Sequence, residues 1–172
     1  VALMADIEGM FHQVRVSVPD RDALRFLWWK EDDVESQPQM YRMTAHLFGG
    51  VWSPSCASFA LKHVAQDHHA LYDTATIKTI DQDFYVDDCL KSVATEEEAT
   101  RLVTQLRELL ARGGFRLTKW LSNSRTVLKS IPQAECAKAV TTIDLEKELL
   151  PSERALGVLW KVETDTFGFD TN

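Results

Sequence analysis

The chain has 172 residues, 45% of them hydrophobic and 26% charged, with a formal net charge of −7. This length suits one well-packed domain, and the composition argues against a disordered chain. No apolar stretch reaches the roughly 18 residues of a membrane span and the first residues lack the features of a signal peptide, so we expect no membrane association and an intracellular, cytoplasmic location. Three widely spaced cysteines, Cys56, Cys89 and Cys136, favour free thiols in a reducing compartment over disulfides or a zinc cluster.

Residues 1–7 form a short apolar run that predicts a buried strand, and Asp6 is the one charged residue in it. Because an unpaired buried charge is costly, Asp6 needs a partner. It is therefore either a structural hydrogen-bonding residue or a metal ligand.

Two apolar and aromatic runs, residues 21–29 and 41–48, predict strands, and the polar segment 30–39 predicts the turn between them. Trp28 and Trp29 are expected to pack against neighbouring side chains rather than to stack on bases.

A helix is predicted to begin after Gly49 and Gly50, with Ser53 as its N-cap and Pro54 at its first position. Its buried face is predicted from apolar residues at helical spacing, namely Ala57, Ala60, Leu61 and Val64.

The central feature is a predicted β-hairpin, in which residues 84–86 lead into Asp87 and Asp88 and residues 89–93 lead away. Two adjacent carboxylates repel one another and favour their protonated forms unless a cation is present. A divalent metal with oxygen ligands, in particular Mg²⁺, would explain the pair. The alternative is a solvated turn, since turns favour Asp.

A second helix is predicted from the capping box of Thr95 and Glu98 to the Gly113-Gly114 pair, with apolar residues at helical spacing between them. Residues 115–120 then predict a strand or extended loop. Residues 155–160 and 166–169 predict a second hairpin. Residues 122–142, which are of mixed character, allow no prediction. In total the order of elements predicts an α+β fold: an antiparallel sheet with helices packed on one face and the carboxylates on the other.

Several motifs together resemble the palm of reverse transcriptases, and most closely those of BEL/Pao-type LTR retrotransposons. The resemblance is carried, in the family's order, by Asp6–Phe11, Phe48-Gly49, Ser53-Pro54, Tyr85–Asp88, Gly114–Trp120, Leu156–Trp160 and Thr164–Phe169. It implies that residues 1–172 are a partial reverse transcriptase domain, a polymerase palm with the start of the connection to the thumb. Most of the fingers and the thumb would lie outside it. Phe48 stands where retroviral enzymes commonly carry a glutamine, which removes one polar contact to the nucleotide.

The resemblance implies RNA-directed DNA polymerisation with two Mg²⁺ ions, for which Mn²⁺ can substitute. Asp6, Asp87, Asp88 and the carbonyl of Ile7 would hold the metal ions, with Asp6 and Asp87 as the indispensable ligands. Lys119 would lie near the leaving pyrophosphate and could donate a proton to it.

The resemblance also implies contacts to substrate. Gly9 and Met10 would offer backbone N–H groups to the triphosphate, and Phe11 would exclude a 2′-hydroxyl by its bulk. Phe48 and Gly49 would border the nucleotide, and the residues expected to touch primer or template are Tyr85, Gly157 and Trp160.

The partners implied are an RNA or DNA template with its primer, a deoxynucleoside triphosphate, and the rest of a Pol polyprotein with RNase H and integrase. The net charge of −7 is unusual for such a protein, because phosphate contacts come from Lys and Arg. Two alternatives remain open. One is a non-catalytic, domesticated or decayed palm that binds nucleic acid or a protein, and the other is a different metal-dependent nucleotidyl transferase or cyclase.

Overall fold

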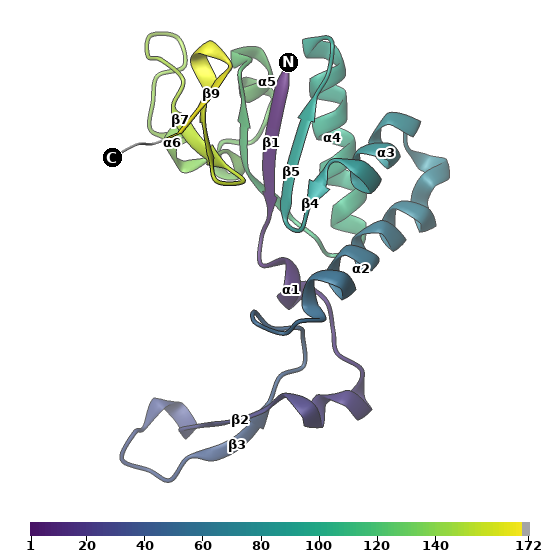
Figure 1. Cartoon of the computed structure of the whole chain (residues 1–172), viewed down its shortest axis with the longest axis vertical. Coiled ribbons are helices and arrows are strands. Elements are labelled where there is room, and N and C mark those ends of the chain that lie inside the picture. Colours follow the sequence, from purple (N-terminus) through teal and green to yellow (C-terminus); the bar gives the residue numbers. More distant parts are fainter. Residues whose placement is uncertain (170–172) are drawn as a thin grey trace. The chain divides into compact units, whose positions relative to one another are not determined.

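The computed structural model describes residues 1–169. The chain divides into two compact units, one made of residues 1–8 and the residues from 61 onward, the other of residues 9–60. Figure 1 labels most of the helices and strands, and we describe each unit by itself.

The first unit is built on a four-stranded antiparallel sheet with the strand order β4-β5-β1-β6. Its strands are β1 (Ala2–Ile7), β4 (Phe84–Tyr85), β5 (Asp88–Ser92) and β6 (Leu117–Ser122). Leu3, Ala5 and Ile7 of β1 are at most 3% exposed. The predicted strand at the start of the chain and the predicted central hairpin are therefore confirmed.

Helix α4 (Glu96–Arg112) is the longest helix of this unit and lies against the sheet (Figure 1). The Thr95 side chain accepts a hydrogen bond from the Glu98 amide, and the Glu98 carboxylate accepts one from the Ala94 amide. The capping box therefore forms at the predicted place, although its second bond goes to the residue before the N-cap. The apolar residues at helical spacing are buried: Ala99, Leu102, Val103, Leu106, Leu109 and Leu110.

A further helix, α3 (Thr74–Gln82), was not predicted. Its buried residues are Thr76, Thr79 and Ile80, so two of the three are polar and the apolar periodicity is weak. The buried Thr79 hydroxyl donates a hydrogen bond to the Ala75 carbonyl one turn earlier. Two short helices, α5 (Arg125–Ser130) and α6 (Lys138–Thr141), occupy the segment that the sequence left open.

The C-terminal part of the unit is a second antiparallel sheet of β7 (Ser152–Ala155), β8 (Val158–Lys161) and β9 (Thr166–Gly168). The predicted second hairpin is confirmed, since β8 pairs with β9. Its first strand begins at Val158 and not at 155, because a turn at Leu156 and Gly157, both with positive φ, separates β7 from β8. A core of buried residues joins Met4 and Leu121 of the first sheet to Ala155, Trp160 and Val162 of this segment.

The second unit contains α1 (Met10–Gln13), two 3-10 helices, the antiparallel ribbon of β2 (Arg25–Trp28) and β3 (Gln39–Arg42), and the first turns of α2 (Ser53–His68). The strand predicted over 21–29 begins only at Arg25, because Pro19 opens a 3-10 helix that runs to Leu24. The strand predicted over 41–48 is limited to its first two residues, since β3 ends at Arg42.

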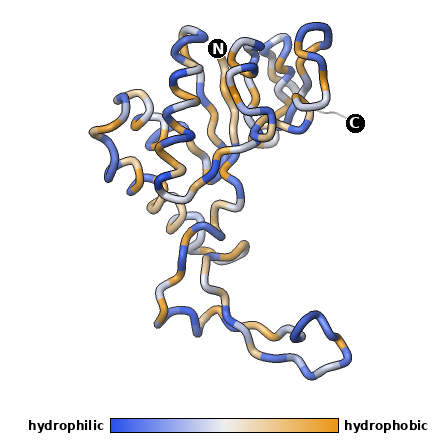
Figure 2. Tube along the Cα trace, turned by 180° about the vertical axis from the view of Figure 1, so that it is seen from behind, coloured by the Kyte–Doolittle hydropathy of each residue, from blue (hydrophilic) through white to orange (hydrophobic). Residues whose placement is uncertain are grey.

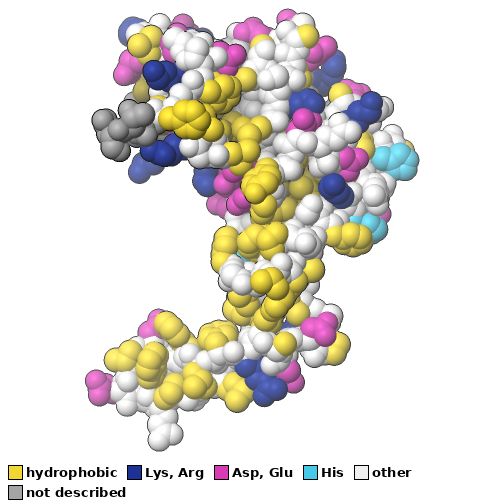
Figure 3. Space-filling view, viewed as in Figure 1, with side chains coloured by type: hydrophobic (Ala, Val, Ile, Leu, Met, Phe, Trp, Pro, Cys, Tyr) yellow, Lys and Arg dark blue, Asp and Glu magenta, His cyan; other side chains and the backbone are white. Residues whose placement is uncertain are grey.

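Both strands of the ribbon are exposed along their whole length. Hydrophobic side chains of this unit are visible on its surface in Figure 3, and Figure 2 shows apolar and polar residues interleaved along its trace. Trp28 is 51% exposed and its indole N–H donates to Asp32, so the expected packing of Trp28 is limited to an edge contact with Trp29.

Helix α2 begins at Ser53, one residue before its predicted first position, so Ser53 is not the N-cap. The Ser53 hydroxyl is buried and has no hydrogen-bond partner within the described part of the chain. Ala57 and Leu61 are buried as predicted, whereas Ala60 and Val64 are only partly buried.

The combination of antiparallel sheets with helices is consistent with the predicted α+β class. Of the helices in residues 1–169, none is both long enough and apolar enough to cross a membrane.

Candidate active site

Asp6 and Asp88 lie directly opposite one another on the two central strands of the sheet. Asp6 is the last but one residue of β1 and Asp88 is the first residue of β5, and the register pairs their Cα atoms. Residues directly opposite in an antiparallel pair point to the same face, with Cβ atoms about 4.5–5.5 Å apart. Strand pairing therefore brings together two carboxylates that are 82 positions apart in the sequence.

Asp87 occupies the two-residue turn that joins β4 to β5. Tyr85 pairs with Asp88, so Val86 and Asp87 form the turn itself. Val86 has a φ of 55°, a conformation that is unfavourable for a β-branched residue. The Asp87 carbonyl accepts a hydrogen bond of 2.9 Å from the Ile7 amide, which ties the strained turn to β1.

Lys119 reaches Asp6 because β6 is irregular at this point. The pairing of β1 with β6 shifts by one residue between Met4 and Asp6, and Lys119 has a φ of 53°. Such a bulge re-aims a side chain. The Lys119 ammonium donates a hydrogen bond of 2.9 Å to Asp6 Oδ2. This hydrogen bond, with the charges of Asp6 and the Asp pair, raises the pKa of Lys119 above its ordinary value.

The surroundings of Asp88 alter the acidity of its carboxyl group. Partial burial raises the pKa of Asp88, the charges of Asp87 and Asp6 raise it further, and Lys119 acts in the opposite direction. A carboxylate that is both desolvated and repelled by like charges is characteristic of functional sites.

Asp6 and Asp88, but not Asp87, line a pocket of about 340 Å³. It is lined by Asp6, Asp88 and Lys119 and by three charged residues that the sequence did not indicate, Lys138 of α6 and Glu153 and Arg154 of β7. No local signal marks these three as site residues, because only the packing of the C-terminal segment against the sheet brings them to the carboxylates.

The donor chemistry of this cluster fits a divalent cation. The Lys119 ammonium interacts with the charges of Asp6, Asp87 and Asp88, and carboxylate oxygen is the ligand type that Mg²⁺ and Mn²⁺ prefer. Within residues 1–169, however, no three His, Cys, Asp or Glu side chains already stand close enough together to hold an ion. Lys119 is paired with Asp6 instead.

The residues predicted to contact the nucleotide belong to the second unit. Gly9, with a φ of 55°, precedes α1, and Met10 and Phe11 on that helix are 2% and 9% exposed. Phe11 packs edge to face on Phe48, with ring centroids 5.0 Å apart. Phe48 is 63% exposed and Gly49 follows it with a φ of 87°, so an accessible aromatic ring stands beside a glycine loop.

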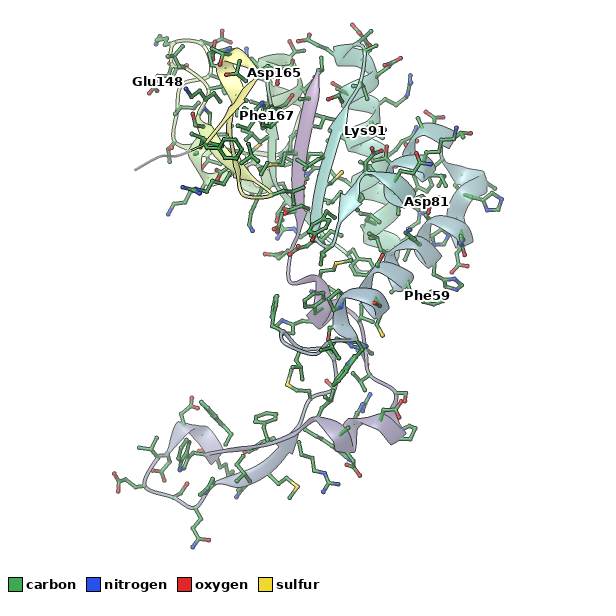
Figure 4. All side chains as sticks on the ribbon, viewed as in Figure 1. Phe59, Asp81, Lys91, Glu148, Asp165 and Phe167 are labelled. Carbon is green, nitrogen blue, oxygen red and sulfur yellow. The ribbon has the colours of Figure 1, made fainter. Side chains whose placement is uncertain are left out.

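The residues predicted to touch primer or template differ in their exposure to solvent. Tyr85 is 67% exposed at the edge of the sheet, and Gly157 lies at the tip of the β7–β8 turn. Trp160 is 2% exposed and its indole N–H donates to Asp165, which is labelled with Phe167 in Figure 4. Trp160 is therefore a core residue of the C-terminal sheet, and the tip residues are the ones open to a ligand.

Comparison of the chain with models of known protein families and with curated proteins finds no match.

Proposed function

We propose that this chain is the palm-containing part of an RNA-directed DNA polymerase of the BEL/Pao type, with fingers and thumb contributed by further regions of a Pol polyprotein. The observation that carries the proposal is the pairing of Asp6 with Asp88 across two strands, with Asp87 in the adjoining strained turn and Lys119 delivered by a bulge. The reaction would join a primer 3′-hydroxyl to the α-phosphorus of a deoxynucleoside triphosphate and release pyrophosphate.

Asp6, Asp87 and Asp88 would hold the Mg²⁺ ions, with the Ile7 carbonyl as a further oxygen ligand. When bound, the ions supply activation of the attacking hydroxyl and neutralise charge on the phosphates. The raised pKa of Asp88 supports this role, because a bound cation would compensate for the desolvation and the repulsion that raise it.

Lys119 is protonated at neutral pH, since its pKa lies above the ordinary value for lysine. It would leave Asp6 for the departing pyrophosphate and donate a hydrogen bond or a proton to it. On the nucleotide side, Phe11 would limit the space at the sugar. Its edge contact with Phe48 supports this role because it restrains the ring.

The test is primer extension on an RNA template with Mg²⁺, using the chain together with its fingers and thumb regions. Asp87→Asn should abolish extension without lowering the melting temperature, because it removes a charge that repels Asp88. Asp81→Asn, a matched change at an exposed position on α3 (Figure 4), should leave extension intact. Deoxynucleotides should be used in preference to ribonucleotides. Extension by Asp87→Asn at the unaltered rate would refute the proposal.

One observation favours a second candidate, a palm that binds nucleic acid or a protein without catalysis. Lys119 neutralises Asp6, and a cluster fixed in that arrangement would not take up a cation. Primer-template binding that is independent of Mg²⁺, without extension, would be its signature.

A further inference from the structure

The hairpin that carries Asp87 and Asp88 has one poorly supported side. On the β1 side, five residue pairs hold β5 in register. On the other side lies β4, an edge strand of only two residues. A strained turn persists only where the surrounding structure determines it, so the β4 side needs support of its own.

Asp83 supplies that support at the junction between α3 and β4. Its amide donates to the Thr79 carbonyl and closes the helix, and its carbonyl accepts a hydrogen bond of 3.0 Å from the Leu90 amide. Its backbone is not extended, with φ −114° and ψ 14°. The side chain therefore does not lie opposite Leu90, as the hairpin register alone would place it, but turns to Lys91, whose ammonium donates to Asp83 Oδ2 over 2.6 Å.

This ion pair is more shielded from water than most in the chain. The side chains of Lys91, labelled in Figure 4, and Asp83 are 26% and 24% exposed. A comparable lysine–aspartate pair, Lys147 with Asp144, is 81% and 44% exposed. Partial burial reduces solvent screening, so the Asp83–Lys91 pair restrains its two partners more strongly than a surface pair does.

The pair also connects the hairpin to a fixed helical layer. At the other end of α3, the Asp73 carboxylate pairs with Arg101 of α4 over 3.1 Å. Gln105 of α4 accepts hydrogen bonds from the Asp73 amide and from the Thr76 hydroxyl. Helix α3 is thus held on α4, and the contacts of Asp83 with Leu90 and Lys91 fix β5 relative to α3.

We propose that Asp83 and Lys91 are positioning residues that hold the strained turn, and with it Asp87 and Asp88, at the place in the sheet where these carboxylates would bind a divalent cation. The inference rests on the proposed function only in requiring that these carboxylates bind a metal ion. Neither Asp83 nor Lys91 would touch the ion or the substrate.

The experiment is a Mn²⁺ titration of the chain followed by electron paramagnetic resonance, which needs no polymerase activity. Asp83→Asn and Lys91→Met should each weaken Mn²⁺ binding about 10-fold, as the loss of a supporting partner of metal ligands commonly does. A purely electrostatic effect on Mn²⁺ affinity would differ in sign between the two variants. Removing the Lys91 charge would tighten Mn²⁺ binding, and removing the Asp83 charge would weaken it. Weakening by both changes therefore separates positioning from charge.

The double variant Asp83→Asn with Lys91→Met should bind no more weakly than either single variant, because both changes break the same contact. The exposed pair supplies matched controls, and Lys147→Met and Asp144→Asn should leave the affinity unchanged. Circular dichroism checks folding, and Lys91→Gln, with the same expected loss, repeats the test if Lys91→Met does not fold.

The titration distinguishes failure of the proposed metal centre from failure of the positioning role alone. No Mn²⁺ binding by the unaltered chain, or binding that survives Asp87→Asn, would overturn the proposed metal centre. Binding that Asp87→Asn abolishes but that Lys91→Met leaves equal or tighter would overturn the positioning role alone.

Discussion

Replacement of Asp88 by asparagine should stabilise the protein while removing a group that the proposed reaction needs. In the folded chain the Asp88 carboxylate is partly desolvated and lies near the charges of Asp87 and Asp6, which is why its pKa is raised. Asparagine has nearly the same shape and carries no charge. The substitution therefore removes an unfavourable interaction of the folded state.

The size of the effect follows from the strand register. A cross-strand neighbour at about 5 Å repels by about 1 kcal/mol in a water-like dielectric. Asp88 has two acidic neighbours, Asp6 across the strands and Asp87 beside it in the chain, and the Lys119 ammonium offsets part of their repulsion. Since Asp88 is only partly buried, screening reduces the remainder, and we expect a net stabilisation of about 0.5 kcal/mol at neutral pH. For a chain of this length that is an increase in melting temperature of about 1–2 °C.

The stabilisation should depend on pH in one direction. A carboxyl whose folded-state pKa is raised destabilises the folded state above that pKa, and the cost is relieved as the group takes up a proton. The advantage of Asp88→Asn should thus be full at pH 7 and should shrink as the pH falls through the raised pKa of Asp88 towards 3.8, its ordinary value.

The assay is thermal unfolding followed by circular dichroism at several pH values between 7 and 4. Asp81→Asn, at an exposed position on the same unit, is the control and should not change the melting temperature. A melting temperature of Asp88→Asn equal to or below that of the unaltered chain at pH 7 would refute the electrostatic reasoning. So would an advantage that stays constant with pH.

Three further predictions concern the support of the site. Gly113→Ala should destabilise the chain by about 1–3 kcal/mol in denaturant unfolding, because the new Cβ would lie 2.2 Å from Val64 Cγ2, and adding Val64→Ala should restore most of that loss. Val86→Gly should raise the free energy of unfolding by about 1 kcal/mol in the same assay, because relief of strain at a φ of 55° outweighs the added freedom of the unfolded chain. A lower free energy of unfolding would show that the turn is unstrained. Lys119→Met should lower stability at neutral pH, because it removes the ion pair with Asp6. The difference from the unaltered chain should vanish as the pH rises through the pKa of Lys119, which is raised above 10.5. Unfolding measured at a series of alkaline pH values tests this.

The elements predicted best from the sequence are those whose signals are local. Helix α4 has its capping box, its apolar period and its terminal glycines within 20 positions, and the observed ends and buried face of the helix match these signals. The central hairpin is likewise local, since its two strands are joined by a two-residue turn. Helix α3 was missed because its buried face is largely threonine, which an apolar pattern does not register.

The site itself depends on pairings between distant parts of the chain, and these could not be read from local patterns. The pairing of Asp6 with Asp88 needs the register of β1 on β5, and the approach of Lys119 needs a bulge in β6. Resemblance to a family indicated these residues, whereas periodicity did not. Lys138, Glu153 and Arg154 were missed by both, because they reach the pocket only through the C-terminal packing.

Backbone strain gives an independent reason to regard the carboxylate face as a functional site. Val86, Lys119 and Leu156 all have φ values between 50° and 55°, where side chains of their types rarely occur. Val86 adjoins Asp87, Lys119 contacts Asp6, and Leu156 forms the tip of the hairpin whose first strand lines the apolar pocket next to β1 and β5. Each such conformation costs of order 1–3 kcal/mol, and glycine would remove most of that cost. Local preference and the fold therefore disagree at three places around one face of the sheet, and disagreements of this kind concentrate where side chains are placed for chemistry rather than for stability.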